Sequence, residues 1–162
     1  MMKTLWISIL MLAATAAFAQ PVSFRIGEGL QEGPLKAKIN SNMSLLLSEI
    51  NEAAGASRTL DLSAVSITEE AARSLAMLWR NRPFRLDETQ VVERLLRTYD
   101  GGYQLRNIPI EMRDAAGKTV YQELVVDMNA AGTITLVNLA IEANLYRKIM
   151  AAGSQVSDLR HR

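Results

Sequence analysis

The sequence of 162 residues contains no cysteine, and its single histidine, His161, is the residue before the last. Without cysteine the chain cannot form a disulfide, a thiolate zinc site, an iron–sulfur cluster or a cysteine nucleophile. One terminal histidine argues against a Ser-His-Asp triad and against a histidine-based metal site. We therefore expect no metal and no cofactor, and we assign no catalytic residue.

The chain also lacks an excess of charge of either sign. It has 18 Lys and Arg against 17 Asp and Glu, which gives a formal net charge of +1. A dedicated nucleic-acid or polyanion binder is normally strongly basic, so nucleic acid is not an expected partner. The length suits one domain with a core of its own.

The first nineteen residues have the pattern of a secretory signal peptide. Lys3 gives a positive start, Leu5 to Ala17 is almost wholly apolar, and Ala17-Phe18-Ala19 matches a small-x-small cleavage site. The apolar run is shorter than the roughly 20 residues that span a bilayer. We expect an exported protein, periplasmic or extracellular, that begins at Gln20 and has no transmembrane span. An uncleaved N-terminal anchor is the alternative.

Beyond residue 19, the pattern predicts a flexible N-terminal segment (20–33), one α+β domain (34–153), and a polar tail or linker (154–162). The flexible segment holds one brief strand pattern, Val22, Phe24 and Ile26. Gly27-Glu28-Gly29 follows it, but Gly33 is one residue late for a dinucleotide-binding fingerprint and no second βαβ unit follows.

Two helices are expected before the strands. Apolar residues recur at three- and four-residue spacing over 34–54, with Pro34 at the first position and Gly55 at the exit. A second helix should open at the capping box Ser66-Ile67-Thr68-Glu69 and stop near Asn81, two residues before Pro83.

The rest of the domain reads mainly as strands. Residues 88–99 are ambiguous, and we favour a strand over 91–98 because Asp100-Gly101 is a hairpin signal, with a helix as the alternative. The strand over 103–112 changes its inward parity near Pro109, as a bulge would cause. A hairpin over 119–128 and 133–141 and a short helix over 142–152 complete the domain.

This order predicts an α+β fold in which N-terminal helices pack on a bent antiparallel sheet, followed by a short C-terminal helix. Such a bent sheet would form a cone of the cystatin or nuclear-transport-factor-2 kind, and a cone offers a pocket. The candidate ligand-binding residues of this pocket are Trp79, Phe84, Tyr103, Tyr121 and Arg97. Ordinary core packing is the alternative explanation for the aromatic members of this set.

Five arginines crowd into a short window with two of these aromatics: Arg80, Arg82, Arg85, Arg94 and Arg97. Arginine interleaved with aromatic residues is typical of a surface that stacks nucleic-acid bases. Nearby acids and the export signal instead favour an acidic small ligand or an anionic surface as the binding partner. A solvated, partly ion-paired face is the alternative without function.

A cone-shaped enzyme is the competing functional class. Its acid/base groups would be carboxylates, with Asp61, Glu111 and Asp127 as candidates, and it would pair one of them with a histidine or tyrosine. A carboxylate that faces Tyr103 or Tyr121 in an open cavity would favour the enzyme, whereas a filled apolar interior would favour a binding module. The adjacent acids at 69–70 and 87–88 fit helix caps or turns.

Several segments resemble the N-terminal domain of uncharacterised exported proteins from Bacteroidota. The matching stretches are NMSLLLSEI (42–50), TLDL (59–62), AMLWRNRPF (76–84), GYQLRNIP (102–109), YQE (121–123), NLY (144–146) and SDLR (157–160). The resemblance implies export and a binding or interaction role in the cell envelope, with an unknown envelope protein or a small ligand as partner. In relatives the arginine-containing tail leads into a nuclear-transport-factor-2-like domain. No active-site residue is carried over.

Overall fold

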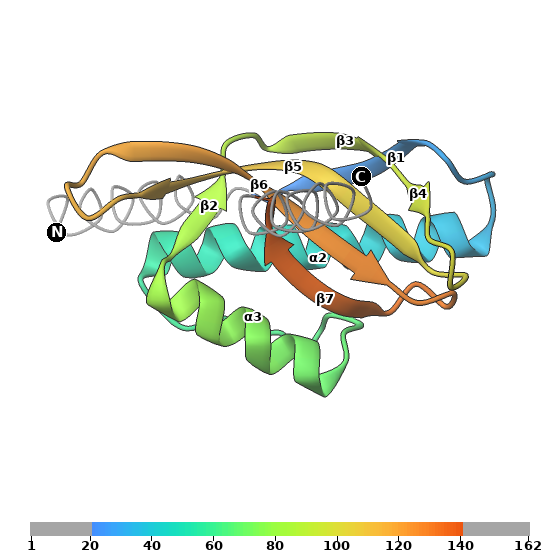
Figure 1. Ribbon diagram of the computed structural model, residues 1–162, viewed down its shortest axis with the longest axis horizontal. Helices are drawn as coiled ribbons and strands as arrows, with labels where there is room; N and C mark the ends of the chain where they lie inside the picture. The colour runs from blue at the N-terminus through green and yellow to red at the C-terminus, as the bar shows by residue number, and fades with distance from the viewer. Residues whose placement is uncertain (1–20, 141–162) are drawn as a thin grey trace, which may run out of the picture.

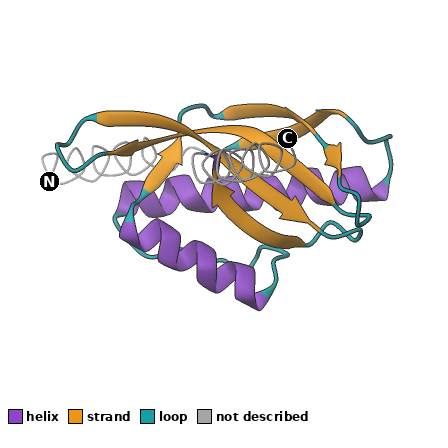
Figure 2. Cartoon of the chain, viewed as in Figure 1, coloured by secondary structure: helices purple, strands orange, loops and turns teal. Residues whose placement is uncertain are grey.

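The computed structural model describes residues 21–140, which fold into the α+β arrangement shown in Figures 1 and 2. The predicted leader (1–19), C-terminal helix (142–152) and tail (154–162) lie outside the described residues. The elements in chain order are β1 (Ser23–Glu28), α2 (Pro34–Ala56), α3 (Glu69–Asn81), β2 (Phe84–Leu86), β3 (Gln90–Arg94), β4 (Leu96–Arg97), β5 (Tyr103–Arg113), β6 (Thr119–Met128) and β7 (Ile134–Leu139).

The larger sheet is antiparallel and bent. Its strand order is β2-β5-β6-β7, and β4 pairs with the same side of β5 as a further short strand. The register of β5 against β6 shifts between Leu105 and Ile108, and the buried positions change parity there. The predicted bulge beside Pro109 is therefore confirmed, as is the predicted class of helices packed with a mostly antiparallel sheet.

Helix α2 runs along most of the molecule, with α3 below it and the β5–β6 turn extending past its end in the view of Figure 1. Its apolar stripe provides the centre of the core: Ile39, Met43, Leu46, Leu47 and Ile50 are fully buried. Burial of each of these side chains contributes about 1.5–3 kcal/mol before entropy is counted. The sequence prediction of this face is confirmed, except that Ala53 rather than Ala54 is the buried alanine near the end.

A second, polar stripe of α2 holds strand β1. The N–H groups of Val22, Phe24 and Ile26 donate to Ser48 Oγ (2.9 Å), Ser44 Oγ (3.0 Å) and Asn40 Oδ1 (2.8 Å). Four residues of helix rise about 6 Å and two residues of strand about 6.6 Å, so the two spacings match. The brief strand expected within the segment 20–33 is confirmed, and its three apolar side chains are buried.

The second helix begins two residues later than the capping box indicated. Thr68 is its N-cap and accepts from the N–H of Ala71 (3.2 Å). Ser66 is engaged elsewhere, because its backbone is bonded to the side chain of Asn42 and to Ile134 of β7. The predicted end at Asn81 is confirmed.

The end of α2 also differs from the prediction. The helix was expected to exit at Gly55, but it continues through Gly55 to Ala56, and Ser57 is its C-cap in the left-handed conformation (φ 52°).

The ambiguous segment 88–99 is extended, as favoured, but it is divided between two sheets. Strand β3 pairs in parallel with β1, and only the two residues of β4 form the expected hairpin with β5. The second predicted hairpin is confirmed as β6 and β7, with the last strand ending at Leu139.

Candidate functional site

A cavity of about 950 Å³ lies at the β2 end of the molecule, where α2 and α3 both end. This volume is near the upper limit of the range of about 300–1,000 Å³ found for sites that hold small organic ligands. Its lining comes from the end of α2 and the loop after it, the second half of α3, β2, and the ends of β5 and β6 that meet at their connecting turn. We call this cavity the β2 hollow.

The floor of the β2 hollow is apolar. Trp79, Phe84 and Met112 line it and are at most 5% exposed. The indole Nε1 of Trp79 donates to the backbone oxygen of Phe84 (2.9 Å), which fixes the ring against β2. Met77 and Tyr121 also line the hollow, but they are 65% and 66% exposed, so they form its mouth.

The lining reaches both faces of the sheet. Phe84 and Met112 are register partners with buried side chains, whereas Arg85, Glu111 and Tyr121 form the next row across β2, β5 and β6. Successive residues of a strand point to opposite faces. Because β2 is the edge strand of this sheet, the hollow extends around the β2 edge.

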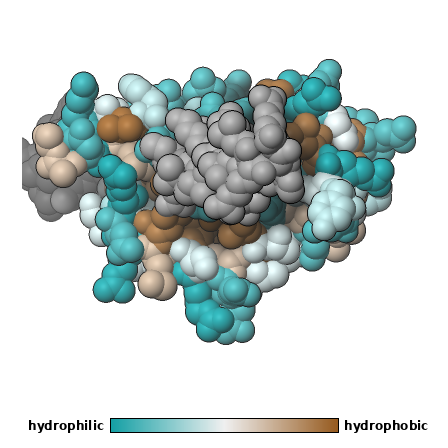
Figure 3. Space-filling model, in the orientation of Figure 1, coloured by the Kyte–Doolittle hydropathy of each residue, from teal (hydrophilic) through white to brown (hydrophobic). Residues whose placement is uncertain are grey.

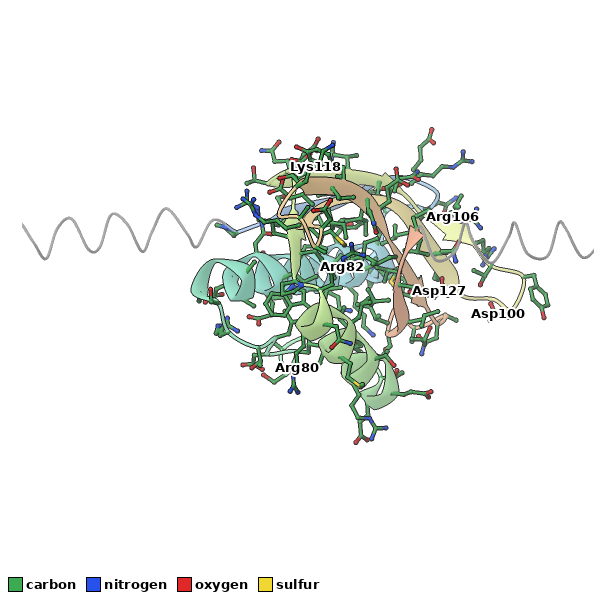
Figure 4. All side chains as sticks on the ribbon, turned by 60° about the vertical axis from the view of Figure 1, so that its left-hand side comes forward. Arg80, Arg82, Asp100, Arg106, Lys118 and Asp127 are labelled. Carbon is green, nitrogen blue, oxygen red and sulfur yellow. The ribbon has the colours of Figure 1, made fainter. Side chains whose placement is uncertain are left out.

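The polar part of the lining is dominated by arginine. Arg58, Arg80, Arg82, Arg85 and Arg113 contribute to it, with Glu111 as the one carboxylate among the described lining residues. Arg80 and Arg82, at the end of α3, are labelled in Figure 4. On the face shown in Figure 3, apolar surface is exposed along the α3 side of the molecule between projecting polar side chains.

Three of these arginines are engaged by groups of the chain. Arg58 binds both carboxylate oxygens of Glu49 (2.8 Å each), and this hydrogen bonding holds the pKa of Glu49 below its ordinary value. Arg85 forms an ion pair with Glu111, and Arg113 Nη1 donates to the backbone oxygen of Gly117 (3.0 Å). Arg80 and Arg82 form no ion pair within residues 21–140.

The free side of β2 is closed by side chains. Trp79 Nε1 donates a hydrogen bond to the backbone oxygen of Phe84, and Asn51 Oδ1 accepts one from the N–H of Leu86 (2.8 Å). A peptide that adds to a sheet edge needs these backbone groups free. The geometry of β2 therefore favours a ligand that contacts side chains over an added strand.

The candidate residues from the sequence separate into two groups. Trp79, Phe84 and Tyr121 all line the β2 hollow. Arg97 and Tyr103 are register partners where β4 meets β5, with Arg97 exposed and Tyr103 buried. This β4 end of the sheet is marked by the labels Asp100, Arg106 and Asp127 in Figure 4, away from Arg80 and Arg82 of the β2 hollow. Arg97 and Tyr103 therefore do not belong to the β2 hollow.

The arginine window separates in the same way. Arg80, Arg82 and Arg85 line the β2 hollow, whereas Arg94 of β3 lies 3.9 Å from Glu28 of β1. Arg58 and Arg113 join the lining from distant parts of the sequence, and sequence reasoning missed both. No local signal distinguishes them, because Arg58 follows the end of α2 and Arg113 is the last residue of β5, and the fold brings both to the lining.

Of the three carboxylates considered for catalysis, only Glu111 lies in the lining. Asp61 accepts hydrogen bonds from the hydroxyl and N–H of Ser63, which lower its pKa, and Asp127 accepts from Gln104 Nε2 (2.6 Å). Glu111 is the register partner of Tyr121 and forms an ion pair with Arg85. Glu111 on β5 thus lies beside Tyr121 on the neighbouring strand β6. A carboxylate next to a tyrosine in an open cavity is the arrangement that would favour the enzyme.

Within residues 21–140, no three acidic or histidine side chains are grouped so that they could hold a metal ion. Neither helix of this region is long and apolar enough to cross a membrane. Comparison with models of known protein families, with curated proteins and with solved structures finds no match to this chain.

Proposed function

We propose that this protein is an exported, non-catalytic binding domain of the bacterial cell envelope, and that the β2 hollow holds its ligand. The observation that carries the proposal is the combination of a large hollow, a buried apolar floor and an arginine-rich border. Such a hollow buries an apolar body while a few charged groups set its orientation. The leader pattern of residues 1–19 supports the proposed export, and the bent sheet is compatible with a cone of the cystatin or nuclear-transport-factor-2 kind.

The emission of Trp79 reports directly on the hollow. The chain has two tryptophans, Trp6 and Trp79, so Trp6→Phe leaves one reporter whether or not the leader is cleaved. Addition of single-chain amphiphiles of each charge type should change the emission saturably for at least one of them. The matched control adds Trp79→Phe and Tyr99→Trp to Trp6→Phe, which moves the single reporter to a fully exposed turn, and its emission should not change. An unchanged Trp79 signal across the panel, in folded protein, would refute the hollow as a ligand site.

An enzyme is the second candidate, and the Glu111–Tyr121 pair favours it. In such an enzyme Glu111 would be the acid/base carboxylate and Tyr121 the tyrosine paired with it. Mass spectrometry of the bound compound after incubation separates the two functions. Recovery of the compound unchanged supports a binding domain, whereas a product that disappears in Glu111→Gln supports the enzyme.

A further inference from the structure

The charged side chains that line the β2 hollow are mostly basic. Five arginines and one carboxylate line it, although the chain as a whole is almost neutral. Arg58 and Arg85 already hold carboxylates of the chain, and Arg113 donates to a carbonyl. This leaves Arg80 and Arg82 as the arginines of the lining with no acidic partner in residues 21–140.

These two arginines are adjacent to the apolar floor. Arg80 is in the last turn of α3, and Arg82 is the C-cap of this helix. Trp79, the residue before Arg80, contributes its buried ring to the floor. A guanidinium binds a carboxylate or phosphate through paired N–H donors. An anionic group at Arg80 and Arg82 would therefore place an attached apolar body against Trp79, Phe84 and Met112.

We propose that the β2 hollow binds an amphipathic organic anion, with its apolar part on this floor and its carboxylate or phosphate on Arg80 and Arg82. The inference rests on the proposed function and names the ligand class of the same site. A small amphiphile fits better than a peptide, because Trp79 and Asn51 occupy the backbone groups that an added strand would need.

The test is a calorimetric titration of the Trp6→Phe chain with four compounds of one chain length, below their micelle-forming concentrations. They are decanoate, decyl phosphate, decanol and decyltrimethylammonium. Each exposed arginine should raise the affinity for an anion about threefold, so decanoate or decyl phosphate should bind about tenfold more tightly than decanol. This preference should shrink as salt screens the arginines.

The double variant Arg80→Gln with Arg82→Gln should weaken the anion about tenfold and leave the affinity for decanol unchanged. The matched control is Arg73→Gln with Arg97→Gln, which removes two exposed arginines that do not line the hollow. Cations near the end of a helix also stabilise it without any ligand. Thermal unfolding without ligand measures that contribution to stability separately, and the titrations are made at a temperature where both variants are folded.

Each outcome separates the two proposals. Preference for an anion that is lost in Arg80→Gln with Arg82→Gln supports the inference, and the relative affinities of decanoate and decyl phosphate identify the headgroup. Equal binding of decanol and the anions, or an unchanged preference in that variant, overturns the inference and leaves the hollow as a ligand site. Binding by none of the four compounds contradicts both proposals for amphiphiles of this size.

Discussion

Asn42 of α2 is hydrogen-bonded to Ser66 in the loop before α3, and Ser66 is in turn bonded to β7. Substitution of Asn42 gives a quantitative test of this connection. The residue is 5% exposed, its Nδ2 donates to Ser66 O (2.9 Å) and its Oδ1 accepts from Ser66 N (2.6 Å). In Asn42→Ala the Ser66 carbonyl keeps a donor, the N–H of Ile134 (3.0 Å). The Ser66 N–H keeps no partner within the described residues.

The expected destabilisation follows from that difference. An N–H left unsatisfied away from water costs about 1–3 kcal/mol, so we expect a loss of about 2 kcal/mol in the free energy of unfolding of Asn42→Ala. Urea unfolding with a slope of about 1–3 kcal/mol per molar should place the midpoint roughly 1 M lower. The amide of Ser66 should also exchange hydrogen faster.

The matched control is Ser41→Ala, one residue away on the exposed side of α2. A surface change of this kind should stay within about 0.5 kcal/mol of the parent. If Asn42→Ala were as stable as Ser41→Ala, the stabilising role given to the Asn42–Ser66 hydrogen bonds would be refuted.

Two further predictions concern pH and backbone approach. Arg58 lowers the pKa of Glu49 in the folded protein, so the ion pair stabilises the fold above the ordinary carboxyl pKa of 4.5, and this stabilisation is lost as the pH falls through the lowered value. Glu49→Gln should therefore lower Tm at pH 7, and the difference in Tm from the parent should close as the pH falls through that lowered value. A Cβ on Gly29, which has φ +102°, would lie 1.9 Å from Leu95 O, whereas Gly33 has open space and an extended φ of 162°. Gly29→Ala should lower the urea midpoint strongly and Gly33→Ala hardly at all; equal effects would contradict the close β1–Leu95 approach.

The part of the fold that local spacing encodes could be predicted from the sequence. The stripe of α2, the stop before Pro83 and the bulge near Pro109 each follow from residues within one element. The capping box failed because Ser66 is bonded to Asn42, a residue 24 positions away. The parallel pairing of β1 with β3 joins segments separated by the whole length of both helices, and no local pattern encodes it.

The candidate site could be predicted only in part for the same reason. Trp79 and Phe84 are near in sequence and remain together in the hollow, and Tyr121 joins them through the β5–β6 register. Tyr103 and Arg97 were predicted as ligand-binding residues from their residue types alone. Residue type does not indicate at which end of the sheet a side chain lies, and these two lie where β4 meets β5. The arginine excess of the lining becomes visible only after the fold adds Arg58 and Arg113.

The measurement that tests the ligand site most directly is methyl NMR of the methionines during titration with decanoate. Met77 and Met112 line the β2 hollow, whereas Met43 and Met128 are buried outside its lining. We predict that the Met77 and Met112 resonances shift saturably with one common affinity, while those of Met43 and Met128 stay in place. Unmoved Met77 and Met112 resonances, or equal shifts of all four, would contradict the β2 hollow as the ligand site.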